Sequence, residues 1–327
     1  MKKMIFLFLL LSFTGMRAGN VPKGVEKARQ SVATLLAYTK GELAGSCTAI
    51  FVGNRGDLLA AKPLFAAADS AVAIDASGKV RRVERVSGAS DIYGCIKLRV
   101  VPDKKIKPAK VSASEVLPGD ELYILSYGVK KKGFVEPVKV TAVDSLYSCA
   151  YYTLALPMQD KYNSLPVVNA AGELVALMQP ASASDTVNSY AIGAAVFEKL
   201  KVTSANYGRG FLSGTAIRAA LPETEQEALS CLYMQAMMGD SLSYRAAIDE
   251  FLGAFPGSYQ GYICDAEFSA VYYRDMDAAS GSWEKALSLS GGSAEVHYAK
   301  GKVINSIVLS GDTLSHPLLT FSNALEA

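Results

Sequence analysis

Apolar residues fall in short runs between residues 30 and 195, and turn residues such as Gly53-Asn54 and Ser77-Gly78 separate the runs. The runs are rich in Val, Ile, Leu and Tyr, which is typical of β-strands. Two sets of strands are predicted, namely Ser31–Tyr38, Ala44–Val52, Ala71–Asp75, Val80–Val86 and Gly94–Val101, then Glu121–Tyr127, Val135–Val143, Cys149–Leu156, Glu173–Met178 and Ser189–Ala194. Many short, closely spaced strands favour barrels or a sandwich over a parallel α/β sheet.

The apolar period becomes helical from about Pro222 onward, after a short helix predicted at Val196–Leu200. Glu223–Met238 and Leu242–Phe255 are amphipathic, and the stretch from Phe251 to Ser258 is similar to the one from Ala286 to Ser293 at an offset of 35 residues. Paired helices with a period near 34 resemble tetratricopeptide repeats. The last helix stops at Ala327, before a repeat's closing proline, which leaves open whether repeats follow.

The N-terminal segment Met1–Ala18 has the order of a secretory signal peptide. Lys2 and Lys3 precede an apolar run from Met4 to Phe13, and small residues follow at Ala18. The run is too short to span about 30 Å of hydrocarbon, so cleavage near Ala18 is predicted rather than a membrane anchor. The sequence therefore predicts a periplasmic or secreted bacterial protein without an integral membrane segment in the mature chain.

Charge divides the 327 residues into two parts. Residues 1–214 carry 27 Lys and Arg against 17 Asp and Glu, whereas residues 215–327 carry 6 against 14, so the halves have net charges of +10 and −8. We expect a barrel domain over residues 22–205, a linker over 206–221 and a helical domain over 222–327. The acidic half predicts a basic partner, or docking against the basic half. Basic runs without interleaved aromatic residues argue against nucleic acid.

Cysteine and histidine limit the chemistry that the chain can support. The five cysteines, Cys47, Cys95, Cys149, Cys231 and Cys264, form no C-x-x-C pair, which argues against zinc. Their disulfide pairing stays open, with Cys47–Cys95 as the pairing favoured for an exported protein. The two histidines, His297 and His316, both lie near the C-terminus. No cofactor and no metal is predicted.

Six segments in order resemble the landmarks of a trypsin-like serine peptidase domain of the bacterial HtrA-like type. These segments are Ala44–Val52, Gly56–Phe65, Ser90–Leu98, Gly119–Ile124, Asn163–Leu174 and Ser189–Gly193. The resemblance covers roughly residues 24 to 200, about 55% of the chain. It implies an all-β trypsin-like double β-barrel, followed here by an all-α tetratricopeptide-repeat solenoid.

The resemblance implies a Ser–His–Asp triad, in which an imidazole takes the serine's proton and a carboxylate orients it. The histidine position aligns with Pro63, which has no titratable group, and the aspartate position is Asp91. Without its histidine, Asp91 is expected to be a cap or a solvated carboxylate. Lys62, beside Pro63, is a weaker candidate for the base because it would have to lose its proton.

The nucleophile position aligns with Asn163, or with Ser164 after a shift of one residue. The family's G-x-S-G-G loop builds an oxyanion hole from backbone N–H groups, and here it reads Lys161-Tyr162-Asn163-Ser164-Leu165. With base, nucleophile and hole all altered, the sequence predicts no catalytic residue and no enzyme activity.

The sequence therefore predicts an exported, inactive homologue of serine peptidases that binds proteins or peptides through the repeat groove or the former protease cleft. The alternative is an active trypsin-like serine endopeptidase with a non-standard catalytic site. A mainly structural envelope protein is a third interpretation. The identity of the partner and the oligomeric state remain open.

Overall fold

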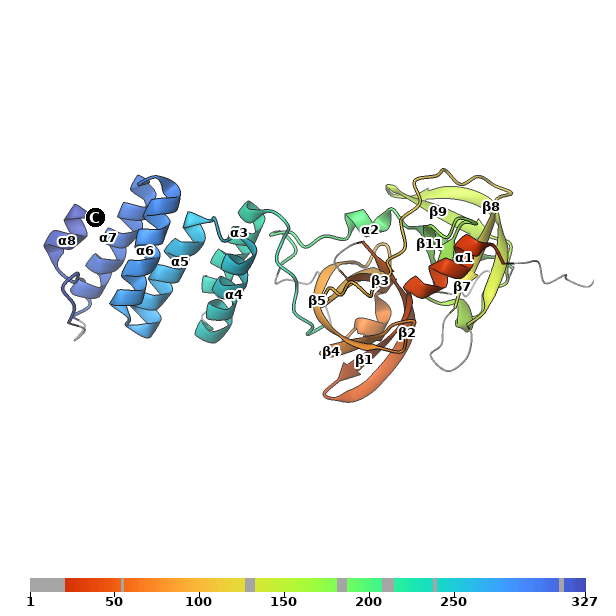
Figure 1. Cartoon of the computed structure of the whole chain (residues 1–327), viewed down its shortest axis with the longest axis horizontal. Helices are drawn as coiled ribbons and strands as arrows, with labels where there is room; N and C mark the ends of the chain where they lie inside the picture. Colours follow the sequence, from red (N-terminus) through yellow and green to blue (C-terminus); the bar gives the residue numbers. More distant parts are fainter. Residues whose placement is uncertain are drawn as a thin grey trace, which may run out of the picture.

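The computed structural model describes residues 21–53, 56–126, 133–180, 187–207, 215–237, 240–311 and 315–327. The predicted signal peptide Met1–Ala18 and the Gly-rich part of the predicted linker, residues 208–214, lie outside the described residues. Two β-barrels make up the first part of the chain, and a row of helices extends away from them (Figure 1).

The first barrel is a closed antiparallel sheet with the strand order β1-β2-β3-β6-β5-β4. Its strands are β1 Val32–Thr39, β2 Glu42–Val52, β3 Asp57–Ala61, β4 Ser70–Ile74, β5 Val80–Ser90 and β6 Cys95–Val100. Alternate residues point inward, as the period of two requires. Leu35, Phe51, Leu58 and Leu98 are buried in the centre of this barrel.

The second barrel is also closed and antiparallel, with the order β10-β11-β12-β9-β8-β7. Its strands are β7 Glu121–Leu125, β8 Val135–Leu146, β9 Cys149–Leu154, β10 Pro166–Val168, β11 Leu174–Met178 and β12 Ser189–Gly193. Ile124, Leu154, Val167 and Ala176 are among its fully buried residues. The all-β class predicted for this part of the chain is confirmed as two closed barrels of six strands.

Each barrel contains one strand more than the predicted sets. The extra strands are β3, which lies between a turn and Pro63, and β10, which begins at Pro166 and has three residues. Three strands are also longer than predicted, since β2 begins at Glu42, β5 extends past Val86 to Ser90 and β8 extends past Val143 to Leu146. A short strand next to proline carries too few residues to display an alternating pattern, and pairing with neighbours defines it instead.

The two barrels share a buried apolar interface. Ile50 and Leu59 of the first barrel and Leu177 and Ile192 of the second belong to one cluster of buried residues. The short helix α2, Val196–Lys199, closes this cluster with Val196 and Phe197. At the N-terminus, α1 Lys23–Ala28 and the 3-10 turn η1 Arg29–Ser31 precede β1.

The N-terminal helix lies against the second barrel at the turn before β11. A Cβ atom added to Gly172 would lie 2.1 Å from the carbonyl oxygen of Gly24, and Gly172 has a φ of +81°. Only glycine satisfies both the close approach and the backbone conformation. Helix α1 is therefore fixed against the second barrel although the first barrel follows it in sequence.

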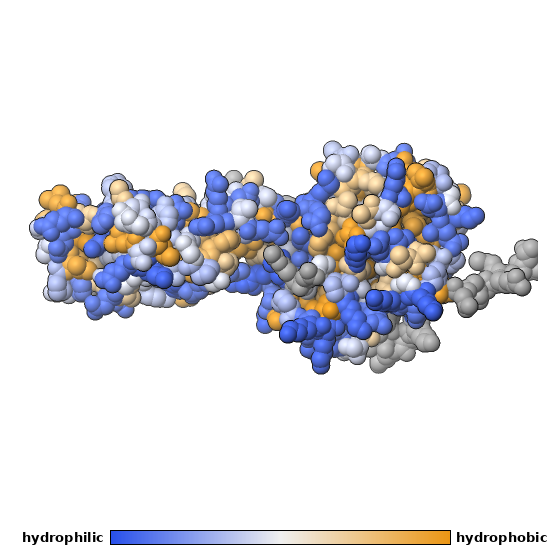
Figure 2. Space-filling view, turned by 45° about the horizontal axis from the view of Figure 1, so that its top comes forward, coloured by the Kyte–Doolittle hydropathy of each residue, from blue (hydrophilic) through white to orange (hydrophobic). Residues whose placement is uncertain are grey.

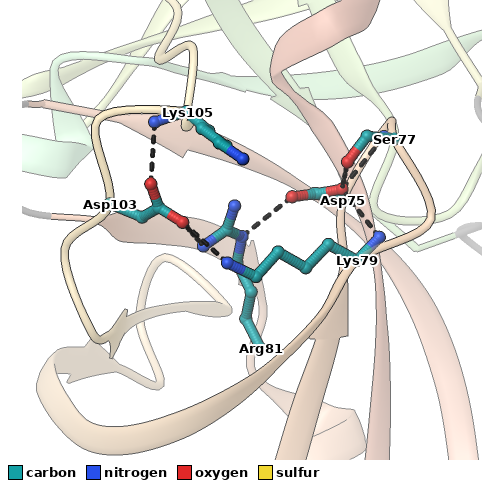
Figure 3. A network of polar contacts seen from close by, with 6 residues as sticks. All are labelled: Asp75, Ser77, Lys79, Arg81, Asp103 and Lys105. Carbon is teal, nitrogen blue, oxygen red and sulfur yellow. Dashed lines mark hydrogen bonds and ion pairs between the residues drawn. The ribbon is translucent and has the colours of Figure 1, made fainter.

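A charged network fastens the connector between the barrels, residues 101–120, to the first barrel (Figure 3). The Arg81 guanidinium on β5 donates to Asp75 at 2.8 Å and to Asp103 of the connector at 3.0 Å. Lys79 Nζ also reaches Asp103, at 2.8 Å. The side chain of Arg81 is only 6% exposed, so its charge is compensated inside the protein.

Part of the predicted linker packs on the first barrel. The N–H of Ala216 donates to the carbonyl of Ala68, and Ala219 forms a parallel bridge with Val86. Ile217 is buried in the core of the first barrel. The chain therefore leaves the barrel only after about residue 220.

The second part of the chain consists of helices. Their bounds are α3 Glu225–Met237, α4 Ser241–Ala254, α5 Tyr259–Phe268, the π-helix η4 Ser269–Tyr273, α6 Met276–Ser290, α7 Ala294–Leu309 and α8 Phe321–Glu326. Consecutive helices pack side by side along the row (Figure 1). Apolar surface is exposed in patches along the row and is interrupted by polar residues (Figure 2).

Helix capping recurs at one offset in this part. Asp240 caps α4 and Asp275 caps α6, 35 residues apart, while Ser258 caps α5 and Ser293 caps α7 at the same spacing. Buried positions share the offset, since Tyr244, Ile248 and Phe251 of α4 correspond to Ala279, Trp283 and Ala286 of α6. The offset of 35 residues noted in the sequence is therefore a structural repeat.

In the described residues no helix combines the length and the apolar character that crossing a membrane requires.

Candidate functional site

Ser164 lies where the two barrels meet. The 3-10 turn η3, Asp160–Tyr162, leads into it, and Ser164 has a φ of +65°, which is uncommon for a residue with a side chain. Its Oγ donates to the carbonyl of Thr48 on β2 at 2.8 Å and accepts from the N–H of Ala61 on β3 at 3.0 Å. Ser164 is 2% exposed, so its hydroxyl joins a loop of the second barrel to two strands of the first.

The two alternatives for the nucleophile position differ in burial. Asn163 is exposed, and its backbone N–H donates to the carbonyl of Asp160. The N–H of Leu165 donates to the carbonyl of Tyr162. These two N–H groups are therefore engaged within the loop and do not point together at a site where an oxyanion would form.

Lys62 and Asp91 form an ion pair where the sequence places the base and the acid of a triad. Lys62 Nζ lies 2.5 Å from Asp91 Oδ1, and the lysine side chain is 12% exposed whereas that of Asp91 is 75% exposed. Pro63 begins the 3-10 turn η2, Pro63–Phe65, directly after Lys62. Asp91 thus has a partner, which the sequence analysis did not assign to it.

A cavity of about 160 Å³ opens beside this ion pair. Phe65, Ala89 and Ile96 form its apolar part, while Lys62 and Asp91 contribute charge to its lining. Thr215 of the segment after the undescribed residues also lines it, and its hydroxyl donates to the carbonyl of Ala68. An apolar cavity next to a few polar groups is the usual form of a binding site.

Gln179, which follows β11, contributes an amide near the same cavity. A Cβ atom on Gly94, a cavity residue, would lie 3.2 Å from Gln179 Oε1. Within the described part of the chain, the Nε2 atom of Gln179 is buried with no nitrogen or oxygen partner, and the Gln179 side chain is hydrogen-bonded to the Cys95 sulfur instead.

The cysteines are all free thiols, so the favoured Cys47–Cys95 disulfide is not formed. Burial raises the pKa of Cys47 to about 12, against a smaller opposite effect of its hydrogen bond with Ser164. Burial also raises the pKa of Cys95 to about 12, although a hydrogen bond with Gln179 opposes it. Both thiols therefore line the junction of the barrels as protonated groups.

The two histidines lie in the helical part, away from Ser164. His297 is on the exposed side of α7, and His316 Nε2 lies 3.3 Å from Asp277 Oδ1. Among the described residues, no three or more His, Cys, Asp and Glu side chains are grouped in a way that could hold a metal ion. Of the sequence candidates, the structure brings Lys62 and Asp91 together and places Ser164 against Ala61, next to Lys62.

No family model and no curated protein matches the chain. Solved structures with a similar fold are serine proteases. The serine endoprotease from Yersinia pestis has 13% identity and a TM-score of 0.47, covering 54% of this chain and 63% of that one. The HtrA-type protease AlgW with tripeptide has 19% identity and a TM-score of 0.46, covering 54% and 60%. The chain thus matches less than two thirds of each of these proteins.

The Rv3671c protease from M. tuberculosis, in its active form, has 12% identity and a TM-score of 0.48, covering 60% of this chain and 89% of that one. The two closed six-stranded barrels of this chain agree with the double β-barrel predicted from the sequence. The prediction that the chain is not an enzyme is wrong as a conclusion about this fold, because the similar structures are serine proteases and one is described as active.

Proposed function

We propose that this chain binds an extended segment of polypeptide at the cavity beside Lys62 and Asp91. The observation that carries the proposal is the apolar cavity with an ion pair in its lining. An apolar side chain of the ligand would fill the cavity. The ligand class is protein or peptide, with no nucleic acid and no cofactor.

The test is binding of fluorescein-labelled casein to the full chain, measured by fluorescence anisotropy. Ala66 is an exposed residue of the cavity lining, so Ala66→Trp would place an indole over the opening. We expect this variant to weaken binding about tenfold, whereas Ala278→Trp, an equally exposed change on α6, leaves it unchanged. Equal affinity of both variants would refute binding at the cavity.

The second candidate is a serine endopeptidase with a non-standard catalytic site. The observation in its favour is that Ser164 Oγ is hydrogen-bonded to Ala61 N, one residue from the Lys62–Asp91 pair. Lys62 would take the hydroxyl proton of Ser164 while Oγ attacks the scissile carbonyl carbon. Lys62 must first give up its own proton to solvent, because an ammonium group has no lone pair, and Ser164 must release Thr48.

A fluorophosphonate probe, which labels activated serines, tests this second candidate together with casein hydrolysis. Activity through Ser164 predicts labelling that disappears in Ser164→Ala and in Lys62→Met. Labelling that survives in both variants would assign it to another residue. If the protein binds casein but is not labelled and does not cleave casein, the endopeptidase is rejected and polypeptide binding is supported.

We also propose that the helical part is a tetratricopeptide-repeat array and that the chain is exported by residues 1–18. The repeat of 35 residues in caps and buried positions supports the first point. The basic start and apolar run of the sequence support the second. Mass spectrometry of the chain recovered from a bacterial periplasm tests export, and an N-terminus that still begins at Met1 would contradict it.

A further inference from the structure

Helices α3, α5 and α7 contribute to one groove in the helical part, far along the chain from the barrel cavity. The groove holds a cavity of about 260 Å³, which is lined among others by Ala236, Tyr244, Glu267, Tyr272, Lys302 and Ser306. This set combines aromatic rings with one carboxylate and one ammonium group.

Glu267 is a partly buried carboxylate in this lining. Among the described residues it has no hydrogen-bond partner and no ion pair within 4.0 Å. Burial raises the pKa of Glu267, and the more distant charge of Lys302 only partly opposes that effect. A half-desolvated carboxylate without a close partner is stabilised when a cation reaches it.

The wall beside Glu267 is formed by an unusual turn. Residues Ser269–Tyr273 form a π-helix, which ends at Arg274 with a left-handed φ of 58°. Such wide turns occur frequently at functional sites. Here the turn carries Val271 and Tyr272 to the groove, and the Tyr272 ring stacks on Phe268 with 4.8 Å between centroids while staying 48% exposed.

The helical part as a whole is negative, and the cavity lining holds one carboxylate, that of Glu267. Lys302 is the ammonium group within the cavity lining. Residues 215–327 have a net charge of −8, which opposes the approach of an acidic ligand.

We propose that this groove binds an arginine or lysine side chain of an extended basic polypeptide, with Glu267 as the counter-ion and Tyr272 as an aromatic wall. Arginine fits best, because its planar guanidinium pairs with a carboxylate and stacks on a ring at the same time. The neighbouring helix shows the same chemistry, since the Arg245 guanidinium lies 5.3 Å from the centroid of Phe268 and pairs with Asp265. The groove goes beyond the proposed polypeptide site at the barrels, so either proposal can fail alone.

The test uses the full chain and a fluorescein-labelled, extended peptide of alternating Arg and Ser residues. A second peptide carries neutral citrulline in place of each Arg, and a third carries Glu. We expect the Arg peptide to bind at least tenfold more tightly than the citrulline peptide, and the preference to shrink as salt screens the charges. Equal binding of the two peptides, or tighter binding of the Glu peptide, would overturn the proposal.

Three variants connect the binding to the groove. Glu267→Gln keeps the shape of the side chain and removes its charge, so it should weaken binding of the Arg peptide about tenfold. Glu284→Gln, on the exposed side of α6, should leave that affinity unchanged. Lys302→Gln should tighten binding several-fold, because Lys302 competes for Glu267. A gain of affinity cannot arise from misfolding, so a Lys302→Gln variant that binds no better would count against the groove. Ala66→Trp, the variant that tests the barrel cavity, should bind the Arg peptide as tightly as the unchanged chain does.

Discussion

The two barrels share one topology but hold it together by different means. The first barrel relies on charges, since Arg81 joins Asp75 and Asp103, and Arg99 on β6 pairs with Asp57 on β3 at 2.8 Å. The second relies on rings, since Tyr151 and Tyr190 stack across β9 and β12, and Phe134 meets Tyr162 edge-on. The same strand order can therefore be stabilised by different side-chain interactions. The stability of the first barrel should depend on pH and salt, whereas that of the second should not.

The largest expected effect comes from breaking the charged network of the first barrel. Arg81→Met leaves Asp75 and Asp103 without their guanidinium, and removing one partner of a buried pair costs about 3–5 kcal/mol. Urea unfolding of the variant measures the free energy. Its exposed neighbour Arg82 provides the control, since Arg82→Met should cost under about 0.5 kcal/mol. Similar costs for both variants would show that the network does not stabilise the barrel.

A smaller effect is expected at the junction of the barrels. Ser164→Ala removes a hydroxyl that bonds to Thr48 and Ala61, leaving two partly buried backbone groups unpaired, at a cost of about 1–3 kcal/mol. The same unfolding experiment tests it, with Ser114→Ala at an exposed connector position as the control. An unchanged stability would mean that Ser164 does not join the barrels, whatever its part in chemistry.

The second barrel should lose less stability when one of its aromatic rings is removed. Tyr151 and Tyr190 stack with 5.8 Å between centroids, and such a pair contributes about 0.5–1.5 kcal/mol beyond burial. Tyr151→Leu should therefore cost about 1 kcal/mol, equally at low and high salt. A cost that depends on salt would contradict the contrast between the barrels.

Mild acid should have the smallest effect on the stability of the fold. Burial raises the pKa of Asp75, but hydrogen bonds from Ser77 and Arg81 outweigh it, so the pKa lies below 3.8; hydrogen bonds from Lys79, Lys105 and Arg81 lower that of Asp103. A lowered folded pKa stabilises the fold above the unfolded value, and this contribution disappears as pH falls through the folded pKa. The melting temperature should thus change little from pH 7 to about pH 4 and then fall. In Arg81→Met the melting temperature should fall less steeply below about pH 4.

Repeating patterns carried most of the fold that the sequence could predict. The apolar runs of β1 and β11 and the helical period of α4 arise from local burial, so these elements were found within a few residues of their bounds. β3 and β10 were missed because proline borders them and their pairing is long-range. The π-helix at Ser269–Tyr273 has no sequence signal of its own, since it depends on how α5 packs on its neighbours.

The candidate site was only half accessible to sequence reasoning. The six landmarks placed Lys62, Asp91 and Ser164 in one region, but the sequence could not give the direction of a side chain. The Lys62–Asp91 pair joins residues 29 positions apart, and the bonds of Ser164 reach residues more than 100 positions away. The Lys62–Asp91 contact exists only after the first barrel has closed, and those of Ser164 only after the two barrels have packed together.

The free thiols have a practical consequence for biophysical work on this protein. Cys95, Cys149, Cys231 and Cys264 are buried, and a thiol with a pKa of about 12, such as Cys47, is ionised in only about one molecule in 10⁵ at pH 7. Alkylating dyes react with the thiolate. A cysteine introduced at exposed Ala66 or Ala278 would therefore take a maleimide fluorophore selectively, with no need to delete the native cysteines first.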